Sequence, residues 1–264
     1  MYVQPSAPRS IGGVLDDAFR LYTASLPKIW PLAVAAAVVL VIPNIFLGLA
    51  TLKNAALGPQ AALGMMKSPG LWLTYLLLIM LYLVLYTAMM SSINSVALGR
   101  QASLGDALSI GTRLMPRTFA AGFLMGLMVG IGCVLLLIPG IYLWGIFQLV
   151  FVAIVVEDTG IGDSFGVSRR LIKGYWWRSA TITSVSIVIV MVFSFLAGFL
   201  GALLSGLLGF NTVAAVVTRA LVGGVVNLFV YAMLPCFLVA MYYDLKLRHE
   251  GGDLAARVDA LAAR

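Results

Sequence analysis

The sequence has few charged residues and few of the side chains on which most active sites depend. Only 10% of its 264 residues are charged and 62% are hydrophobic, whereas a soluble domain carries about 25% charged residues. The single histidine, His249, lies in the polar C-terminal segment, which disfavours a serine–histidine catalytic pair. No cluster of metal ligands and no glycine-rich phosphate loop with a lysine is visible in the sequence. We therefore expect a membrane protein that is not an enzyme and that has no metal and no cofactor.

Cysteine is also scarce. Cys133 and Cys236 both lie inside apolar runs, which favours small buried hydrophobic residues over a disulfide or a metal pair. The N-terminal sequence MYVQPSAPRS lacks the basic-then-apolar order of a cleaved signal peptide. We expect the first span to be retained as a signal anchor.

Long hydrophobic runs are what the sequence has in abundance. A bilayer core of about 30 Å needs roughly 20 apolar residues in a helix. The run over 119–156 is too long for one span, and Pro139-Gly140 is a turn signal that divides it into a helical hairpin. Pro235 predicts a tilt or kink in the last span. The sequence thus predicts an all-α polytopic protein with six transmembrane helices, over 30–50, 71–96, the two halves of 119–156, 180–210 and 213–243.

The distribution of basic residues predicts the orientation. Six spans place both termini on one side of the membrane. Of the 17 lysines and arginines, only Lys53, Lys67 and Arg219 fall in or near the loops on the opposite side, so both termini are predicted to be cytoplasmic. This orientation explains the basic pI of 9.6 better than a nucleic-acid partner does.

A short phrase occurs three times and divides the chain into similar units. Each copy is followed by two apolar stretches and carries an Arg-Leu pair at one fixed offset: Arg20-Leu21, Arg113-Leu114 and Arg170-Leu171. We expect a three-fold internal repeat of an amphipathic helix plus a helical hairpin, within a single membrane domain over 1–264. The units are 10–100, 103–157 and 160–243, and 244–264 is a polar cytoplasmic tail. The copies begin at Ser10-Ile11-Gly12-Gly13, Ser103-Leu104-Gly105-Asp106 and Gly160-Ile161-Gly162-Asp163.

The phrases predict three short amphipathic helices that lie at the cytoplasmic interface. Ser103 with Asp106 is typical of a capping box at a helix start. In the third copy, Ser164 and Ser168 interrupt the apolar stripe. In the first copy, Asp16, Asp17 and Arg20 take the polar face, and the apolar stripe consists of Ile11, Val14, Leu15, Ala18, Phe19 and Tyr22.

Basic and aromatic residues gather in and beside these helices. One interpretation is that they only anchor the helices and set the angle of the next span, because membrane electrostatics alone places basic residues there. The alternative is that they bind anionic lipid headgroups. We favour the first. The candidate interfacial or headgroup residues are Arg20, Arg113, Arg117, Arg169, Arg170, Lys173, Trp176, Trp177 and Arg178.

Small residues recur every four positions in two of the spans, where they let helices approach closely. We expect packing within the bundle, with a contact between copies of the chain as the alternative. The residues are Gly122, Gly126 and Gly130 in the third span, and Ser194, Gly198, Ala202 and Gly206, beside Ala197, Gly201, Ser205 and Gly209, in the fifth.

Polar residues inside the spans are few. No acidic residue lies deep in any span, which disfavours a proton-coupled transporter, and Arg219 is close enough to the outer end of the last span to reach the interface. We take Asn94, Gln148 and Asn227 as the candidate lining of an intramembrane cavity.

Two aspartates suggest an alternative that we reject. Gly162-Asp163 and Tyr243-Asp244 are similar to the paired aspartates of intramembrane aspartyl proteases, in which two carboxylates share a proton. Asp163 begins a polar helix, where a carboxylate caps the backbone, and Asp244 lies in a charged segment with Lys246 and Arg248. The pair also occurs in the reverse order to that family.

Four segments together resemble a known bacterial group: 10–22, Leu137-Ile138-Pro139-Gly140-Ile141-Tyr142, 155–174 and 242–248. The chain resembles six-span inner-membrane proteins related to the membrane domain of glycerophosphoryl diester phosphodiesterase. In enzyme-bearing relatives the chemistry lies in a separate soluble barrel, so no phosphodiesterase residue carries over. The resemblance implies a bacterial inner-membrane protein that anchors, organises or handles lipid.

These observations favour a non-enzymatic inner-membrane protein that acts as a membrane-organising or partner- and lipid-binding module. The alternative is a transporter or lipid translocator with a cavity between the repeats. The expected partners are membrane lipids, anionic at the cytoplasmic face, with a membrane-protein partner or a homo-oligomer as further alternatives. A continuous polar groove between the repeats would favour the translocator, and a dry, glycine-packed centre would favour the module.

Overall fold

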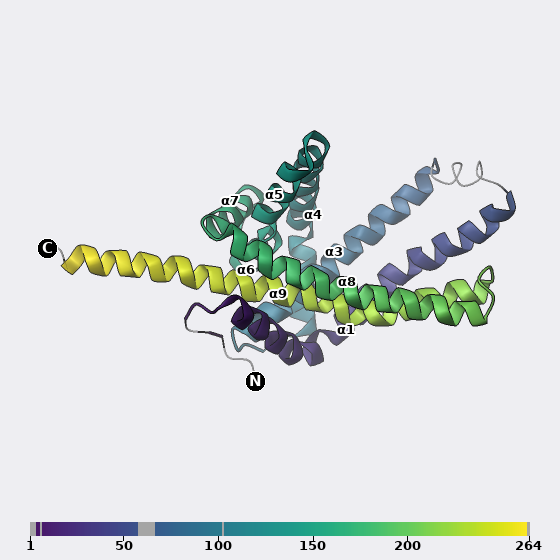
Figure 1. Ribbon diagram of the computed structural model, residues 1–264, viewed down its shortest axis with the longest axis horizontal. Helices are drawn as coiled ribbons and strands as arrows, with labels where there is room; N and C mark the ends of the chain where they lie inside the picture. The colour runs from purple at the N-terminus through teal and green to yellow at the C-terminus, as the bar shows by residue number, and fades with distance from the viewer. Residues whose placement is uncertain (1–3, 6, 58–66, 102, 263–264) are drawn as a thin grey trace.

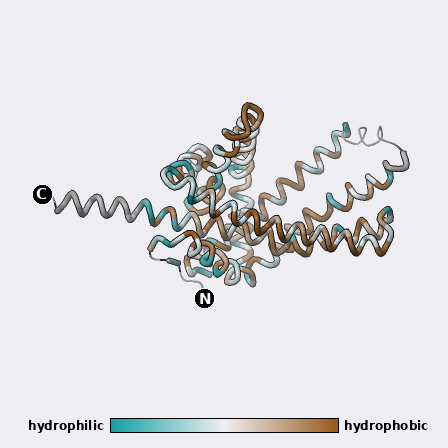
Figure 2. Tube along the Cα trace, in the orientation of Figure 1, coloured by the Kyte–Doolittle hydropathy of each residue, from teal (hydrophilic) through white to brown (hydrophobic). Residues whose placement is uncertain are grey.

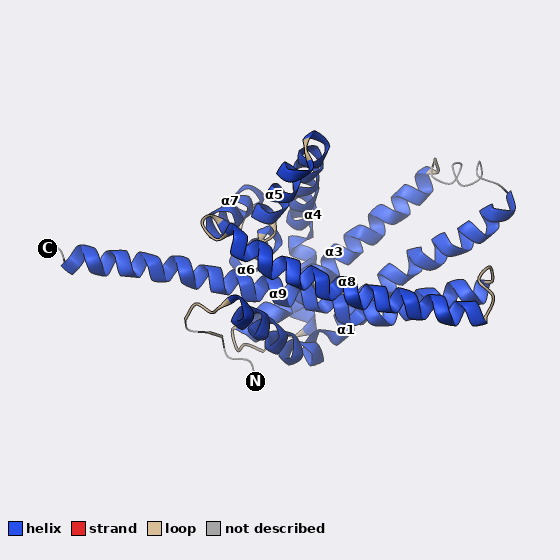
Figure 3. Ribbon diagram, in the orientation of Figure 1, coloured by secondary structure: helices blue, strands red, loops and turns tan. Residues whose placement is uncertain are grey.

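The computed structural model describes residues 4–5, 7–57, 67–101 and 103–262. All regular structure in these ranges is helical (Figure 3). The helices are α1 (Ile11–Leu57), α3 (Pro69–Ala97), α4 (Leu104–Leu135), α5 (Leu137–Phe147), α6 (Val150–Glu157), α7 (Ile161–Ile172), α8 (Trp176–Leu207) and α9 (Val213–Ala262). The outer segment 58–66 of the first predicted unit and the last two residues of the predicted tail lie outside the described residues.

Six helical segments in the described ranges are long and apolar enough to cross a membrane, which confirms the prediction of a multi-pass helical protein. They are Ile11–Lys53, Pro69–Ala97, Leu104–Leu135, Leu137–Glu157, Trp176–Leu207 and Val213–His249. The first segment begins well before residue 30, because the first copy of the repeated phrase continues into the span as one helix. The second copy likewise continues into α4. Only the third copy, α7, is a separate helix.

The predicted hairpin in the long apolar run is confirmed, but its turn lies at Leu136. That residue is extended (φ −160°, ψ 137°) and separates α4 from α5. Pro139 falls in the first turn of α5, where a missing backbone N–H breaks no helical hydrogen bond. A Cβ atom on Gly140 would lie 2.1 Å from the Cys133 Sγ. The glycine therefore permits the close approach of the two helices rather than the turn itself.

Three helical hairpins spread from a common base (Figure 1). The α1–α3, α4–α5 and α8–α9 pairs form the arms, and the base contains α6, α7 and the beginning of α1. Between the arms, α1 packs on α9 as well as on α3, and α3 packs on α4. Figure 2 shows hydrophobic residues along most of each arm, and side chains such as Phe195 (74% exposed) point outward. Such surfaces suit lipid.

The densest packing lies in the base. Tyr242 and Phe237 of α9 are almost completely buried, together with Met89 and Ile93 of α3 and Leu21 of α1. All five belong to one hydrophobic cluster that joins α1, α3, α4, α6, α7, α8 and α9. Because segments more than 200 residues apart in sequence contribute to it, this cluster holds the three hairpins together.

The copies of the phrase bury residues at the same offsets. Leu21, Leu114 and Leu171 are buried, whereas the arginine before each is exposed. Ser164 and Ser168 therefore lie on the buried face, as polar residues within the stripe. In the first copy Asp17 is buried, not polar-facing, and Phe19 is 40% exposed. The residues that share the buried offsets are Val14, Ala18 and Leu21; Ala107, Gly111 and Leu114; and Ser164, Ser168 and Leu171.

The two predicted small-residue faces are used to different extents within the chain. Ala197, Gly201 and Ser205 of α8 are buried, and a Cβ on Gly201 would lie 3.3 Å from the Arg219 Cγ on α9. A Cβ on Gly126 or Gly130 would meet nothing within 4 Å. A Cβ on Gly122 would lie 3.2 Å from Phe151, so this face of α4 is open only around Gly126 and Gly130 within the described residues.

The last helix passes through two predicted boundaries without a break. Pro235 lies inside α9, which runs from Val213 to Ala262. The predicted boundary of the tail at 243–244 does not coincide with a helix end, and Asp244 and Leu245 are buried in the base. Tail residues 244–249 are thus part of the packed structure.

Candidate functional site

Asp244 is the centre of a polar hub at the base. Its carboxylate forms ion pairs with Arg178 of α8 (2.9 Å) and Arg248 of α9 (3.0 Å), and it accepts a hydrogen bond from the backbone N–H of Arg9 (2.8 Å). Both guanidinium groups also donate to the Arg9 carbonyl oxygen. The Asp244 side chain is only 4% exposed. The hub joins the N-terminal segment to α8 and α9, which is a structural role.

This geometry bears on the protease alternative. Both Asp244 carboxylate oxygens are engaged by donors, whereas Asp163 is exposed in the first turn of α7. No contact between these two aspartates is found among the described residues. A shared proton, which defines an aspartyl dyad, requires direct contact of the carboxyl groups.

A second polar cluster joins α6 to α9. The Tyr242 hydroxyl donates to Glu157 Oε1, and Lys246 Nζ lies 3.2 Å from the same oxygen. Beside it, the Tyr243 hydroxyl donates to Asn94 Oδ1 on α3 (2.6 Å). These contacts hold the inner ends of three helices in place.

The predicted interfacial arginines on α4 meet one partner. Arg113 and Arg117 lie 3.1 Å and 2.8 Å from the Asp158 carboxylate. Asp158 ends α6 with a positive φ of 50°, a conformation that aspartate tolerates better than most residues. The pairing links the start of the second unit to the residue that ends α6, just before the third unit.

The nine candidate interfacial residues separate into groups. Arg20 pairs with Asp16 at 2.9 Å, and Arg113, Arg117 and Arg178 pair as described above. Arg169, Arg170 and Lys173 are exposed on or beside α7 and form no ion pair among the described residues. Trp177 is 80% exposed, whereas Trp176 packs on Tyr142. The structure does not test headgroup binding by any of them, so that role stays a prediction.

A serine of the repeated phrase bridges the break between α5 and α6. The Ser168 hydroxyl donates to the Ile146 carbonyl oxygen (2.7 Å) and accepts from the Leu149 N–H (3.2 Å). Without this hydroxyl, these backbone groups at a helix interruption in a span would lack hydrogen-bond partners. Next to the break, Gln148 Oε1 accepts from the Thr183 hydroxyl of α8.

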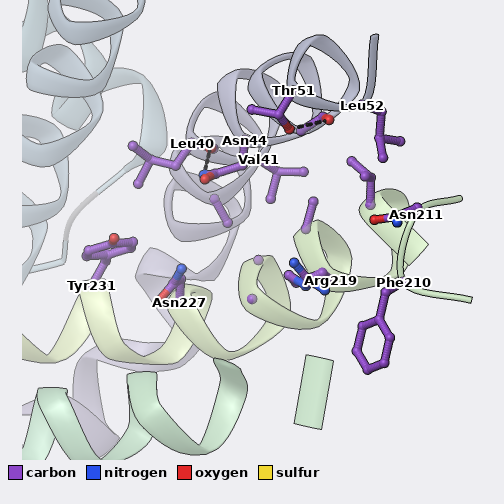
Figure 4. Close-up of a pocket in the computed structure, with 16 residues that line it drawn as sticks. Leu40, Val41, Asn44, Thr51, Leu52, Phe210, Asn211, Arg219, Asn227 and Tyr231 are labelled. Carbon is purple, nitrogen blue, oxygen red and sulfur yellow. Dashed lines mark hydrogen bonds between the residues drawn. The ribbon is translucent and has the colours of Figure 1, made fainter. Parts of the chain in front are cut away.

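An elongated cavity of about 370 Å³ lies between α1 and α9 (Figure 4). On α1 it extends from Ala37 to Leu52, which corresponds to about 22 Å at the rise of an α-helix. Its polar lining is spread along this length, while most of the other lining residues are apolar. The polar residues are Asn44, Thr51, Asn211, Arg219, Asn227 and Tyr231. We call this cavity the α1/α9 groove.

Glycines bring the two walls of the α1/α9 groove together. A Cβ on Gly48 of α1 would lie 2.4 Å from Val216 of α9, and a Cβ on Gly224 would lie 2.4 Å from Val41. The backbones therefore approach closely at two points. Polar side chains beside this seam, including Asn44 and Asn227, lie on opposite walls of the groove (Figure 4).

Arg219 carries the charge of the α1/α9 groove. Its Nη2 atom donates to the Ser205 hydroxyl of α8 (3.0 Å), and within the described residues no carboxylate lies within ion-pair distance of it. The Asn44 amide donates to the Leu40 carbonyl oxygen (2.7 Å), and the Thr51 hydroxyl donates to that of Gly48 (2.7 Å). The groove thus combines a cation with several amides and no opposing charge from the described residues.

The three residues predicted to line one cavity are not brought together. Asn227 lines the α1/α9 groove, but Asn94 and Gln148 are not among its lining residues and bond to Tyr243 and Thr183. Among the other polar residues that line the groove, Arg219 could be recognised in the sequence, because it is a lone charge in the last span. The sequence contained no signal that α1 and α9 would place Asn44 and Thr51 opposite it.

The cysteines and the other potential ligands in the described part of the chain form no cluster. Cys133 is exposed, Cys236 is buried, and both are free. No group of three or more histidine, cysteine, aspartate or glutamate side chains in the described ranges could hold a metal ion.

Residues 18–245 match the family described as a domain of unknown function, DUF7847. The match covers most of the sequence, so the chain belongs to this family. A search of curated proteins and a search of solved structures found no match. The family description names no activity and no link to glycerophosphoryl diester phosphodiesterase, and that resemblance stays a prediction.

Proposed function

We propose that the protein is a non-enzymatic, lipid-binding module of the bacterial inner membrane, with both termini cytoplasmic. The observation that carries the proposal is the α1/α9 groove, in which Arg219 has no carboxylate partner among the described residues. Arg219 is exposed near one end of its span, and an ionisable side chain within a span is a candidate ligand site. In the base, the Asp244 carboxylate is bound by two arginines and a backbone N–H, which supports a structural rather than a catalytic role.

The proposed module consists of three related units, each with a copy of the phrase at the cytoplasmic interface: as the first turns of α1 and α4, and as the separate helix α7. The support is that the three copies of the phrase bury residues at identical offsets and expose their arginines. Exposed Arg169, Arg170 and Lys173 on the third copy would attract anionic lipid at that face.

A protein partner or a second copy of the chain is a further part of the proposal. The glycine face of α4 around Gly126 and Gly130 has open space beside it, and small residues of this kind form close helix contacts in membranes. Lipid binding and such a contact are compatible, because the face lies on a different arm from the α1/α9 groove.

The test is to extract the protein directly from its membrane into native-lipid discs and to measure the lipids by mass spectrometry. Discs of equal size from the same membrane without the protein are the control. The proposal predicts one phospholipid class enriched above the control, and no lipid cleavage on incubation of the purified protein. A lipid composition equal to the control, or turnover of any lipid, would contradict it.

A second candidate function is lipid translocation along the α1/α9 groove. The observation in its favour is that polar side chains occur at several depths, from Asn211 beside the α8–α9 turn to Tyr231 further along α9. Vesicles with reconstituted protein and a fluorescent phospholipid would test it. Faster exchange between leaflets than in empty vesicles supports translocation, and an equal rate leaves lipid binding without transport.

A further inference from the structure

We infer that the Arg219 region of the α1/α9 groove binds the phosphate group of a phospholipid in the leaflet opposite the Asp244 hub. This inference rests on the proposed lipid binding and assigns it a site, a ligand chemistry and a side of the membrane. The site consists of Arg219 with Thr51 on the facing wall and Asn211 at the end of the groove.

The chemistry of Arg219 fits a phosphate. A guanidinium group has five N–H donors in a planar fork that matches two oxygens of a phosphate. One of these donors is used by Ser205, and none of the others has a carboxylate partner among the described residues. Arg219 is exposed, so its remaining donors are accessible to an anionic group at the headgroup level.

The position of Arg219 is set by α8. A Cβ on Gly201 would lie 3.3 Å from the Arg219 Cγ, so the arginine stem crosses α8 where that helix has no side chain. One turn further, the Ser205 hydroxyl accepts from the guanidinium and is itself held by a bond to the Ala202 carbonyl oxygen (2.9 Å). The side chain is therefore oriented before a ligand binds, which reduces the entropy lost on binding.

The surrounding groups select a lipid over a free anion. The lining of the groove includes Leu40, Val41, Leu52 and Val216 as well as the polar residues. Exposed apolar residues such as Leu221 (53%) and Val225 (63%) lie further along the same helix. A phosphate attached to acyl chains can place its headgroup at Arg219 and its chains along these surfaces, whereas inorganic phosphate gains only the polar contacts.

The side of the membrane follows from the fold. Arg219 lies six residues after the start of α9 at Val213, about 9 Å along the helix axis. Asp244 lies toward the other end of the same span, and the turn between α8 and α9 is at the far tip of the arm from the base (Figure 1). The site is therefore at the depth of the headgroups of the leaflet away from the two termini.

The experiment compares variants of the full chain, purified in detergent and mixed with dioleoyl phosphatidylglycerol or with dioleoylglycerol, which lacks the phosphate. Native mass spectrometry counts the lipids that each variant retains. The variants are R219Q, R219K and S205A. K53Q is the matched control. Lys53 is an exposed cation near the C-terminal end of α1, but it does not line the α1/α9 groove. Thermal unfolding in detergent without lipid checks that each variant folds.

The site predicts that wild type and K53Q retain phosphatidylglycerol in preference to dioleoylglycerol. R219Q should bind it about tenfold more weakly, and R219K and S205A should lie between. Inorganic phosphate should not displace the lipid.

Equal retention of phosphatidylglycerol by R219Q and wild type would overturn the site but leave the proposed lipid binding intact. Failure of wild type to retain either lipid would overturn both. Displacement of the lipid by inorganic phosphate would overturn the assignment to a lipid and make the groove a site for a soluble anion.

Discussion

Arg178 at the start of α8 and Asp244 of α9, in the base of the fold, form an ion pair of 2.9 Å. Both side chains are largely buried, at 16% and 4% exposure. The same carboxylate holds the backbone of Arg9, so one aspartate fixes the N-terminal segment and two helices. Such a hub keeps the hairpins joined at one end while their other ends diverge.

The first prediction concerns this hub. Asp244→Asn keeps the size of the side chain but removes its charge, which leaves Arg178 and Arg248 without a counter-ion in a buried place. We expect a loss of about 3 kcal/mol in the free energy of unfolding. Unfolding in detergent, followed by circular dichroism, measures it. The exposed pair of Asp16 and Arg20 provides the control, since Asp16→Asn should cost only ~0.5 kcal/mol.

The second prediction concerns the contact between α4 and α5. Gly140→Ala introduces a Cβ that would lie 2.1 Å from Cys133 Sγ and 2.7 Å from its backbone nitrogen. The helices must separate, which should cost about 1–3 kcal/mol. Gly126→Ala on the open face of α4 should leave stability unchanged or raise it slightly. A measured loss at Gly126 similar to that at Gly140 would show that this face is covered after all.

The third prediction concerns the break between α5 and α6. Ser168→Ala removes the hydroxyl that satisfies Ile146 and Leu149. We expect a loss of about 1–3 kcal/mol and faster hydrogen exchange at the Leu149 amide. Ser164→Ala is the matched control, because that hydroxyl bonds only to the Ile161 carbonyl of its own helix. An unchanged hydrogen-exchange rate at the Leu149 amide would mean that water already forms hydrogen bonds with these groups.

The fourth prediction concerns topology. In a background with Cys133→Ser and Cys236→Ser, we expect Ser68→Cys and Ser103→Cys to react with a membrane-impermeant maleimide from opposite sides. Both serines are exposed, and α3 separates them. Ser103→Cys should react only after the cytoplasmic face is opened. Labelling of both from the outside in intact cells would contradict the six-span orientation.

Much of the fold could be predicted from the sequence, because each feature depends on neighbours in the chain. The apolar runs predicted the spans, and the hairpin divided the long run near Pro139. Ser103 caps α4 as the capping box predicted, through a 3.0 Å bond from the Asp106 N–H. The offset of the Arg-Leu pairs marked a leucine that is buried in all three copies.

The parts that could not be predicted depend on contacts between distant segments. Asn44 and Asn227 lie on facing walls only because Gly48 and Gly224 bring α1 and α9 together. Asn94 and Gln148 have the same polar character but meet other partners. Polarity in a span shows that a partner is needed, and the packing of the helices decides which partner it is.

The measurement that tests lipid binding in the α1/α9 groove most directly is photo-crosslinking in the native membrane. A photoreactive side chain replaces Asn227 in the groove or Phe195 on the outer face of α8, and mass spectrometry identifies the lipids attached to each. Our account predicts one phospholipid class enriched at Asn227 and the bulk lipid mixture at Phe195. The same mixture at both positions, or no lipid at Asn227, would contradict it.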